Sequence, residues 1–263
     1  MTEPSETPLA PFGRLVTAAG AGADLRDIPP ATLERWTVES KVVVLRGFPL
    51  LDKDDLIAYC EGWGEILRWD FGAVLDLVVE EDPKNYLFSR TDVPFHWDGA
   101  FAAVAPRYFL FQCVKAPVPG GGGETVFSDS TEVIRRADPE LVREWAATKI
   151  GYRTEKLGYY GGSVDSPLLT EHTETGETIM RYGEPLDPDR YLNPVWVDVH
   201  GRSGADAEAF MADLRDRLHD PSVCYHHEWR DGDIVTVDNQ ALLHGRNAFR
   251  GNSSRHLQRI QVL

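Results

Sequence analysis

Short strand-like runs fill the C-terminal part of the chain and constrain its fold more than any other sequence feature. Four of them follow one another, separated by short polar or irregular stretches such as "RDGD": "VCYHHEW", "IVTVDN", "LLHGRNAF" and "RHLQRIQVL". Their β-branched and aromatic residues are typical of strands. Strands and helices do not alternate along the chain, and no phosphate-binding loop follows the first strand. A doubly wound parallel fold is therefore disfavoured, and the expected class is β-rich (α+β), a barrel or sandwich with helices packed outside.

The rest of the chain adds further strands and a few helices. Apolar residues at helical spacing indicate amphipathic helices, and β-branched or aromatic runs indicate strands. Asp129 is expected to cap a helix, with Glu132 completing a box-like pattern. The predicted strands cover residues 41–48, 73–80 and 107–114 and two halves of 168–182, and the predicted helices cover 51–66 and 206–220.

One domain spanning residues 1–263 is expected, because a β-rich domain of this size is ordinary. Residues 1–12 are acidic and proline-containing and are predicted to be flexible. Residues 155–170 lack strong periodicity, so they are either an active-site lid or a plain surface loop. The glycine run 120–123 is predicted to be a flexible turn, since no Lys-Ser/Thr pair follows it as in a phosphate loop.

The net charge of the chain makes some classes of binding partner unlikely. The chain has 27 basic and 42 acidic residues, a net charge of −15. Such a surface repels phosphate backbones and anionic lipids, so partners of either kind are not expected. No segment approaches the roughly 18 apolar residues of a membrane helix. The three cysteines lack metal-type spacing and are expected to be reduced, mostly buried thiols of a cytoplasmic protein, and a homo-oligomer stays open.

A candidate metal site begins with His96 and Asp98, two residues apart in "FHWDG". In an extended segment both side chains face one side, while Trp97 points away. One imidazole and one carboxylate are two thirds of the 2-His-1-carboxylate set that holds non-haem Fe(II). His244 follows an apolar strand and a polar turn and is the best candidate for the third ligand. It is far from His96 in the sequence, so only a fold that returns the chain, such as an antiparallel barrel, can join them.

Two arginines follow the distal histidine. Arg255 lies eleven residues after His244, and Arg259 four residues further. A guanidinium makes two parallel hydrogen bonds to a carboxylate, so Arg255 suits the far carboxylate of a dicarboxylic co-substrate. The even spacing of the two arginines places both on one face of a strand. Thr125 in "GGGGETVF" is a hydroxyl donor that can assist.

These motifs resemble those of one enzyme family. The segments "FHWDG", "GGGGETVFSD", "GDIVTVDNQALLHGRNAF" and "RHLQRIQV" are similar, in order and spacing, to Fe(II)/2-oxoglutarate dioxygenases of the taurine and 2,4-D dioxygenase (TauD/TfdA-like) group. With the early "VVVLRGFPLLDKDDLIAYCEGWGEI", the resemblance covers nearly the whole chain. It implies a double-stranded β-helix (jelly-roll, cupin-like) core with flanking helices.

The resemblance also implies cofactors and residue roles. Fe(II) is expected on His96, Asp98 and His244. The distal carboxylate of 2-oxoglutarate is expected on Arg255, assisted by Thr125, and O₂ is the oxidant. Halogenases of this fold have a small residue in place of the carboxylate, so Asp98 argues against halogenation. Hydroxylation, desaturation or oxidative decarboxylation, with release of succinate and CO₂, is expected instead.

The substrate is expected to be small. "HWDGAF", "FQCVKAP" and "MRYGEP" look most similar to the branch that modifies isonitrile-bearing or related amino-acid-derived metabolites in secondary-metabolite biosynthesis. A carboxylate-bearing, amino-acid-derived molecule is therefore expected. Arg259 meets its anionic group or braces Arg255, and Arg181 is either a further carboxylate partner or a buried ion-pair residue. Trp97 and Phe101 are the candidates for the pocket wall.

Three alternatives stay open at this point. The first is a catabolic dioxygenase of the same family for sulfonates or aryloxyalkanoates. Trp97 and Gly99 depart from the pattern of the taurine enzyme, which disfavours a sulfonate. The second is a cupin-like iron enzyme that uses no oxo acid. The third is a non-enzymatic relative with a decayed site, against which the complete ligand set argues.

The other histidines are expected to be structural. His226 and His227 are consecutive in a strand, so one faces inward and the other outward. His256 is expected to point away from the cavity. His172, beside a glycine turn, is expected on the surface of a hairpin.

Overall fold

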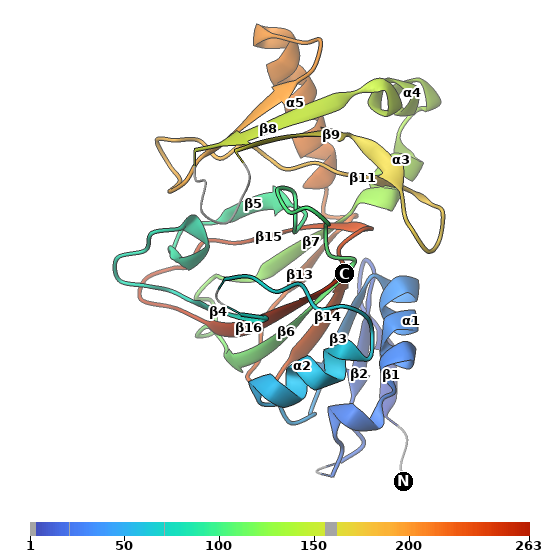
Figure 1. Ribbon diagram of the computed structural model, residues 1–263, viewed down its shortest axis with the longest axis vertical. Coiled ribbons are helices and arrows are strands. Elements are labelled where there is room, and N and C mark those ends of the chain that lie inside the picture. The colour runs from blue at the N-terminus through green and yellow to red at the C-terminus, as the bar shows by residue number, and fades with distance from the viewer. Residues whose placement is uncertain (1–3, 21, 71, 156–161) are drawn as a thin grey trace.

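The computed structural model describes residues 4–20, 22–70, 72–155 and 162–263 (Figure 1). Its largest element is a seven-stranded sheet in the order β1-β2-β3-β14-β6-β16-β4, antiparallel except for the β2–β3 pair. The strands are β1 (Ser5–Pro8), β2 (Arg14–Thr17), β3 (Val42–Arg46), β14 (Ile234–Asp238), β6 (Tyr108–Lys115), β16 (His256–Val262) and β4 (Val74–Val78).

A four-stranded antiparallel sheet, in the order β13-β7-β15-β5, faces the large sheet across an apolar core. Phe109 and Phe111 of β6 enter this core from the large sheet, and Phe127 and Leu242 enter it from the small one. All four side chains are at most 3% exposed, so the two sheets share one buried apolar interface. The strands are β13 (Cys224–His227), β7 (Thr125–Asp129), β15 (Leu242–Arg246) and β5 (Val93–His96).

The unbroken apolar run of β3 reflects burial on both of its faces. Val42 and Val44 belong to the core between the sheets, whereas Val43 and Leu45 belong to the cluster with α1 and α2. The two faces alternate because successive strand residues point to opposite sides. Figure 1 shows both helices against the large sheet. The helices are α1 (Pro30–Ser40) and α2 (Lys53–Glu61).

A second layer covers the outer face of the four-stranded sheet (Figure 1). Trp145 is fully buried there, in a cluster that also contains Leu214 and Leu243. The layer consists of α3 (Ser130–Arg136), α4 (Pro139–Ala147), α5 (Gly204–Leu218), a sheet of β12 (Val195–Val199), β8 (Lys149–Thr154) and β9 (Ser163–Pro167), and a hairpin of β10 (Leu169–Glu171) and β11 (Thr178–Met180). Two short 3-10 helices, η1 (Leu25–Asp27) and η2 (Tyr86–Phe88), complete the described elements.

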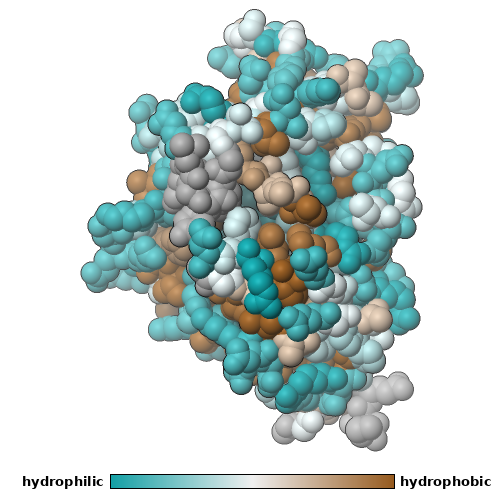
Figure 2. All heavy atoms as spheres, viewed as in Figure 1, coloured by the Kyte–Doolittle hydropathy of each residue, from teal (hydrophilic) through white to brown (hydrophobic). Residues whose placement is uncertain are grey.

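Most of the predicted elements are present. The sheet-rich class with flanking helices is confirmed, and the predicted helices and hairpin correspond to α2, α5 and β10–β11. Asp129 caps α3 by accepting hydrogen bonds from the backbone N–H groups of Thr131 and Glu132. The three cysteines are buried free thiols, as predicted. In Figure 2 hydrophilic residues cover most of the visible face, with hydrophobic residues gathered near its middle.

Two segments predicted to be flexible or loop-like differ in part from expectation. Within 1–12, residues 5–8 form β1 and pair with β2, so the prediction of flexibility is wrong for this part. Of the predicted lid 155–170, residues 156–161 lie outside the described residues, while 163–167 form β9 and pair with β8. Within the described ranges, no helix is both long and apolar enough to cross a membrane.

Candidate active site

The pairing of β15 with β5 brings His96 and His244 together. His96 is the last residue of β5, and His244 lies in the middle of β15, directly opposite it in the antiparallel register. Their ring centroids are 4.3 Å apart. Gly245 permits this approach, because a Cβ there would lie 2.5 Å from the carbonyl oxygen of Val93. The structure therefore returns the chain to the first histidine, as predicted.

Asp98 completes the cluster from a turn. Since β5 ends at His96, the prediction that His96 and Asp98 share one extended strand is wrong. Oδ1 of Asp98 nevertheless lies 3.7 Å from Nε2 of His96 and 3.7 Å from Nε2 of His244. One potential ligand atom from each residue lies within 4.8 Å of the others. Trp97, between the two ligands in the chain, packs edge-on against Tyr152 with ring centroids 5.3 Å apart.

The protonation states of the cluster suit a divalent metal. Burial lowers the pKa of His96, and it holds the pKa of His244 well below its usual value, so both imidazoles are neutral at pH 7. Nδ1 of His96 lies 2.9 Å from the carbonyl oxygen of Pro94, which favours a proton on Nδ1 and a free lone pair on Nε2. Burial alone would raise the pKa of Asp98, but the charge of Arg259, together with the neighbouring histidines and the hydrogen bond from Gln261, outweighs burial and lowers that pKa. Two neutral imidazoles and a carboxylate are the donors of a 2-His-1-carboxylate Fe(II) site.

The spacing of these atoms also fits one ion. Metal–nitrogen and metal–oxygen bonds are about 2.1 Å long, so two of them span up to about 4.2 Å. Each Nε2–Oδ1 separation of 3.7 Å is within that span. The residues present therefore fit an iron ion held by His96, Asp98 and His244.

Two side chains of β16 hold the Asp98 carboxylate. Nη1 of Arg259 donates hydrogen bonds to both Asp98 oxygens, at 3.0 and 2.8 Å, and Nε2 of Gln261 donates to Oδ2 at 2.6 Å. The expectation that Arg259 braces Arg255 is wrong, because its guanidinium is turned to the buried carboxylate. Its contact with a substrate anion stays a prediction.

Arg255 is a buried cation bonded to neutral oxygens. It directly precedes β16 and is 6% exposed. Its Nη1 donates to the carbonyl oxygen of Gly123 at 2.5 Å and to Oγ1 of Thr125 at 2.9 Å. Burial lowers its pKa well below the usual value, and among the described residues it forms no ion pair with a carboxylate. A buried guanidinium in this state suits an anionic ligand, and the predicted pairing of Arg255 with Thr125 is present.

The glycine run 120–123 is closely packed for most of its length, so the prediction of a flexible turn is wrong there. Gly123 has φ +78°, and a Cβ on it would lie 2.2 Å from the ring of Phe249. Gly121 and Gly122 are similarly crowded, whereas nothing lies within 4 Å of a Cβ on Gly120. The close packing holds the Gly123 carbonyl against Arg255.

Two cavities meet at the cluster. One has an empty volume of about 870 Å³ and is lined by His96 and Asp98 and by the predicted wall residues Trp97 and Phe101, with Tyr152 beside them. The other has an empty volume of about 370 Å³. This second cavity, called here the arginine cavity, is lined by Leu77, Leu87, Val93, His96, Phe111, Thr125, His244, Gly245, Arg246, Arg255 and Arg259.

Arg181 lines neither cavity, and its contact with the substrate stays a prediction. It follows β11, and its Nη1 donates to the carbonyl oxygen of Asn239 at 2.7 Å. Burial lowers its pKa to about 10. The hairpin β10–β11 carries it to the turn between β14 and β15 instead of to the cluster.

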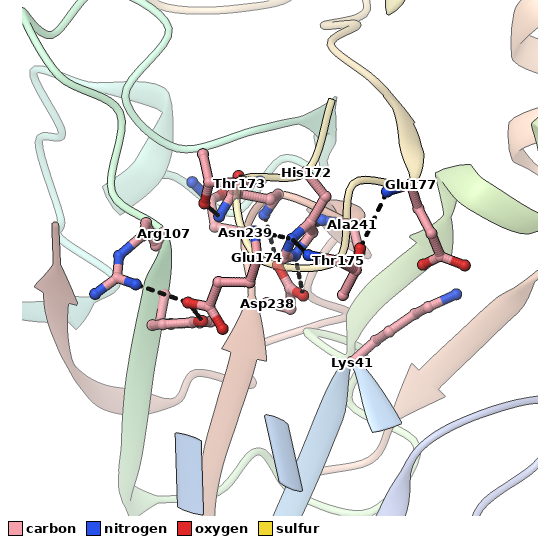
Figure 3. Close-up of polar contacts among 12 residues, drawn as sticks. Lys41, Arg107, His172, Thr173, Glu174, Thr175, Glu177, Asp238, Asn239 and Ala241 are labelled. Atoms are coloured by element: carbon pink, nitrogen blue, oxygen red, sulfur yellow. Dashed lines mark hydrogen bonds and ion pairs between the residues drawn. The ribbon is translucent and has the colours of Figure 1, made fainter. Parts of the chain in front are cut away.

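His172 is also placed differently from expectation. It is 2% exposed, and its Nε2 lies 2.8 Å from Oδ2 of Asp238 (Figure 3). The prediction of a surface position is wrong because the hairpin tip folds against the β14–β15 turn. His226 is exposed and His227 buried, as the strand alternation predicts. His256 bonds to a carboxylate of β4 and lines neither cavity.

Three residues around the cluster were not predicted. Gln261 stands two residues after Arg259 on one strand face, a spacing that could have revealed it. Arg246, two residues after His244, donates to four backbone carbonyls of the loop containing η2, a wall of the larger cavity. Asn239 contacts the backbone of Asp98, which no sequence pattern signals.

Comparisons with known proteins agree with this geometry. The family described as "Taurine catabolism dioxygenase TauD, TfdA family" matches residues 6–261. The 3-((Z)-2-isocyanoethenyl)-1H-indole synthase of Fischerella ambigua is 44% identical over 97% of this chain and 94% of that protein. Tyrosine isonitrile desaturase of Erwinia amylovora is 35% identical over 95% of this chain and 87% of its own length.

Comparison with solved structures also finds relatives from isonitrile pathways. The crystal structure of PvcB from Pseudomonas aeruginosa has a TM-score of 0.82 and 30% identity, covering 98% of this chain and 91% of that one. A second PvcB structure, with a TM-score of 0.80 and 31% identity, is described as an Fe, alpha-ketoglutarate dependent oxygenase from an isonitrile synthetic pathway. The chain therefore belongs to the TauD/TfdA family of Fe(II)- and 2-oxoglutarate-dependent dioxygenases.

Proposed function

We propose that His96, Asp98 and His244 bind Fe(II) and that Arg255 binds the distal carboxylate of 2-oxoglutarate. The observation that carries this proposal is the arginine cavity, which His244 and Arg255 line together. A dicarboxylate there can reach the metal ligands at one end and a buried guanidinium at the other. Thr125 orients Arg255 by accepting its hydrogen bond at 2.9 Å.

Bound Fe(II) supplies the oxidising chemistry, in which O₂ and 2-oxoglutarate are consumed, succinate and CO₂ are released and hydrogen is removed from the substrate. The residues of this chain contribute orientation and exclusion of water. The Pro94 carbonyl fixes the His96 ring, and Arg259 with Gln261 fixes the Asp98 carboxylate.

We infer that the substrate is an isonitrile-bearing derivative of an aromatic amino acid and that the product is an alkene. The names of two relatives support this inference, since one is a tyrosine isonitrile desaturase and the other makes an isocyanoethenyl indole. Trp97, Phe101 and Tyr152 line the larger cavity and suit an aromatic ring. Arg259 lines the same cavity and is the candidate partner of the substrate carboxylate.

We also propose that the two facing sheets form a double-stranded β-helix. The support is their strand order, because consecutive strands alternate between the sheets within β4–β7 and again within β13–β16. The large sheet contains β4, β6, β14 and β16, and the small one contains β5, β7, β13 and β15. A cytoplasmic location is proposed as well. It is supported by the three buried free cysteines, which suit a reducing compartment.

An anaerobic titration tests the cofactor assignment. Adding 2-oxoglutarate to the Fe(II)-loaded protein without O₂ should produce the weak visible charge-transfer band of the chelate. The same titration of His96→Ala should produce no band. A wild-type protein without the band would overturn the assignment, and Arg255→Gln with full activity would favour an iron enzyme that uses no oxo acid.

Succinate release tests the substrate. Isonitrile derivatives of tyrosine and tryptophan should stimulate succinate formation. Mass spectrometry should show a product lighter by two hydrogens for a desaturation that keeps the carboxylate, or by two hydrogens and CO₂ for one that forms an isocyanoethenyl group. Taurine and 2,4-dichlorophenoxyacetate serve as comparison substrates. If either of these gave the faster turnover, a catabolic role would replace the biosynthetic one.

A further inference from the structure

Asn239, in the turn between β14 and β15, uses all of its hydrogen-bonding groups although it is fully buried. Its backbone N–H donates to the carbonyl oxygen of Arg107 at 2.9 Å, and its carbonyl oxygen accepts from Arg181 at 2.7 Å. Its side-chain Oδ1 accepts from the backbone N–H of Asp98 at 2.9 Å. Its Nδ2 donates to the carbonyl oxygens of Asp98, at 3.0 Å, and Pro106, at 2.7 Å. The amide thus binds both backbone groups of Asp98.

Asp98 depends on such a partner because of where it lies. β5 ends at His96, so the sheet does not hold the Asp98 backbone. The next residue, Gly99, has φ +86°, and a Cβ on it would lie 2.6 Å from the ring of Pro106. The carboxylate itself is drawn toward Arg259 on β16, at 2.8 and 3.0 Å. The hydrogen bonds from the Asn239 amide to the Asp98 backbone therefore restrict where this turn can place the carboxylate.

The turn that carries Asn239 is itself anchored (Figure 3). Oδ1 of Asp238 accepts from the backbone N–H groups of Gln240, at 2.9 Å, and Ala241, at 3.1 Å. Oδ2 of Asp238 lies 2.8 Å from Nε2 of His172. Nδ1 of His172 accepts from two backbone N–H groups of the hairpin tip, so its proton lies on Nε2 and is donated to Asp238. This network gives Asn239 a rigid base.

We infer that Asn239 is a positioning residue for the metal site: it fixes the backbone of Asp98 relative to His244, which follows it by five residues and continues into β15. The inference rests on the proposed metal role of His96, Asp98 and His244. An asparagine suits the task because its amide has an acceptor and two donors in one plane. An aspartate there would face the carbonyl oxygens of Asp98 and Pro106 without a proton to donate.

Binding of Mn(II) to the apo protein, measured by titration calorimetry, tests this role without turnover. We expect Asn239→Ala to raise the Mn(II) dissociation constant about 10- to 100-fold, the cost of losing a partner of a metal ligand. The matched control is Gln240→Ala. Gln240 is 3% exposed and lies in the same turn, but its side chain bonds to the backbone N–H and Oγ1 of Thr173 and not to Asp98.

The control should change the Mn(II) dissociation constant by no more than about twofold, because its side chain shares no partner with the ligands. Thermal melting of each apo variant checks folding. If Asn239→Ala does not fold, Asn239→Ser, which also lacks the amide donors, is held to the same 10- to 100-fold expectation. Equal dissociation constants for the Asn239 and Gln240 variants would overturn the role of Asn239.

Failure of the proposed metal site itself gives a different result. In that case wild type would not bind Mn(II), or His244→Ala would bind it as tightly as wild type. Binding by wild type that is lost in His244→Ala and unchanged in Asn239→Ala would reject the positioning role alone.

Discussion

At the residue scale, the charge of Arg255 is buried and its hydrogen-bond partners are neutral. An anionic ligand would therefore supply the opposite charge that the protein itself does not provide there. We expect Arg255→Gln to raise the dissociation constant of 2-oxoglutarate for the Mn(II)-loaded protein about 10- to 150-fold. The reason is that a hydrogen bond to a charged group contributes about 1.5–3 kcal/mol. Titration calorimetry under anaerobic conditions measures the change.

Thr125→Val is the matched comparison for Arg255→Gln, since it removes one neutral acceptor of the same guanidinium and leaves the charge in place. A smaller rise in the dissociation constant of 2-oxoglutarate, about 2- to 12-fold, is expected, because a hydrogen bond of this kind contributes a net of about 0.5–1.5 kcal/mol. An unchanged dissociation constant in Arg255→Gln would mean that the oxo acid binds elsewhere.

Alanine substitutions at two glycines of one turn distinguish the cost of backbone strain from the cost of overpacking. Gly120 and Gly123 have φ angles of +72° and +78°, but only the Cβ of Gly123 would collide with another side chain, 2.2 Å from Phe249. Gly123→Ala is expected to lose about 1–3 kcal/mol more unfolding free energy than Gly120→Ala, as overpacking does. Urea unfolding of the two variants gives the difference. Equal losses would show that the ring moves aside at no cost.

At the element scale, the pairing of β3 with β14 ends in a buried ion pair. Nε and Nη2 of Arg46 donate to the two oxygens of Asp233 at 2.8 and 2.9 Å. Burial alone would raise the pKa of Asp233, but hydrogen bonds from His227 and Arg46 lower it from 3.8 to about 2. The folded protein therefore holds this proton more weakly than the unfolded chain does.

This difference predicts an acid-dependent loss of stability. Above pH 4 the carboxylate is charged in both states, and the ion pair contributes fully. As the pH falls from about 4 to about 2, the unfolded chain takes up the proton first, and about 2 kcal/mol is lost. Asp233→Asn lacks this titration, so the difference in unfolding free energy between wild type and variant should shrink over that range. A constant difference across it would contradict the assigned pKa.

The elements themselves were largely predictable, because strand and helix periodicity is a local property of the sequence. β3, α2 and the β10–β11 hairpin fall within the segments predicted for them, and α5 begins two residues before its predicted segment. β1 was not foreseen, since its four residues are exposed and its pairing with β2 carries no apolar pattern. The turn at Asp98 was not foreseen either, because the sequence pattern does not show that the strand ends two residues before it.

At the scale of the whole molecule, the proposed metal ligands belong to two strands and a turn, so ion binding should stabilise the folded state. Mn(II) with 2-oxoglutarate at about 100 times their dissociation constants should add about 2.7 kcal/mol for each ligand bound. At about 2–4 °C per kcal/mol, Tm should rise by at least 5 °C. Differential scanning calorimetry measures the shift.

Two comparisons make that result specific. A chelator in excess should return Tm to the value of the apo protein, and His244→Ala should show no shift with Mn(II). An equal rise in His244→Ala would place the ion outside the proposed cluster.

The sequence by itself determined the sheet-rich class, the donor set and the order of the motifs. These follow from side-chain chemistry and local spacing, which is why His96, Asp98, His244, Arg255 and Thr125 could be named as candidates without coordinates. The tertiary structure alone decided the partners of the remaining polar residues. Arg259 bonds to Asp98, Arg181 to Asn239 and His172 to Asp238. Each such choice depends on which distant segments pack together, since a buried polar group bonds to whatever partner the fold brings within reach.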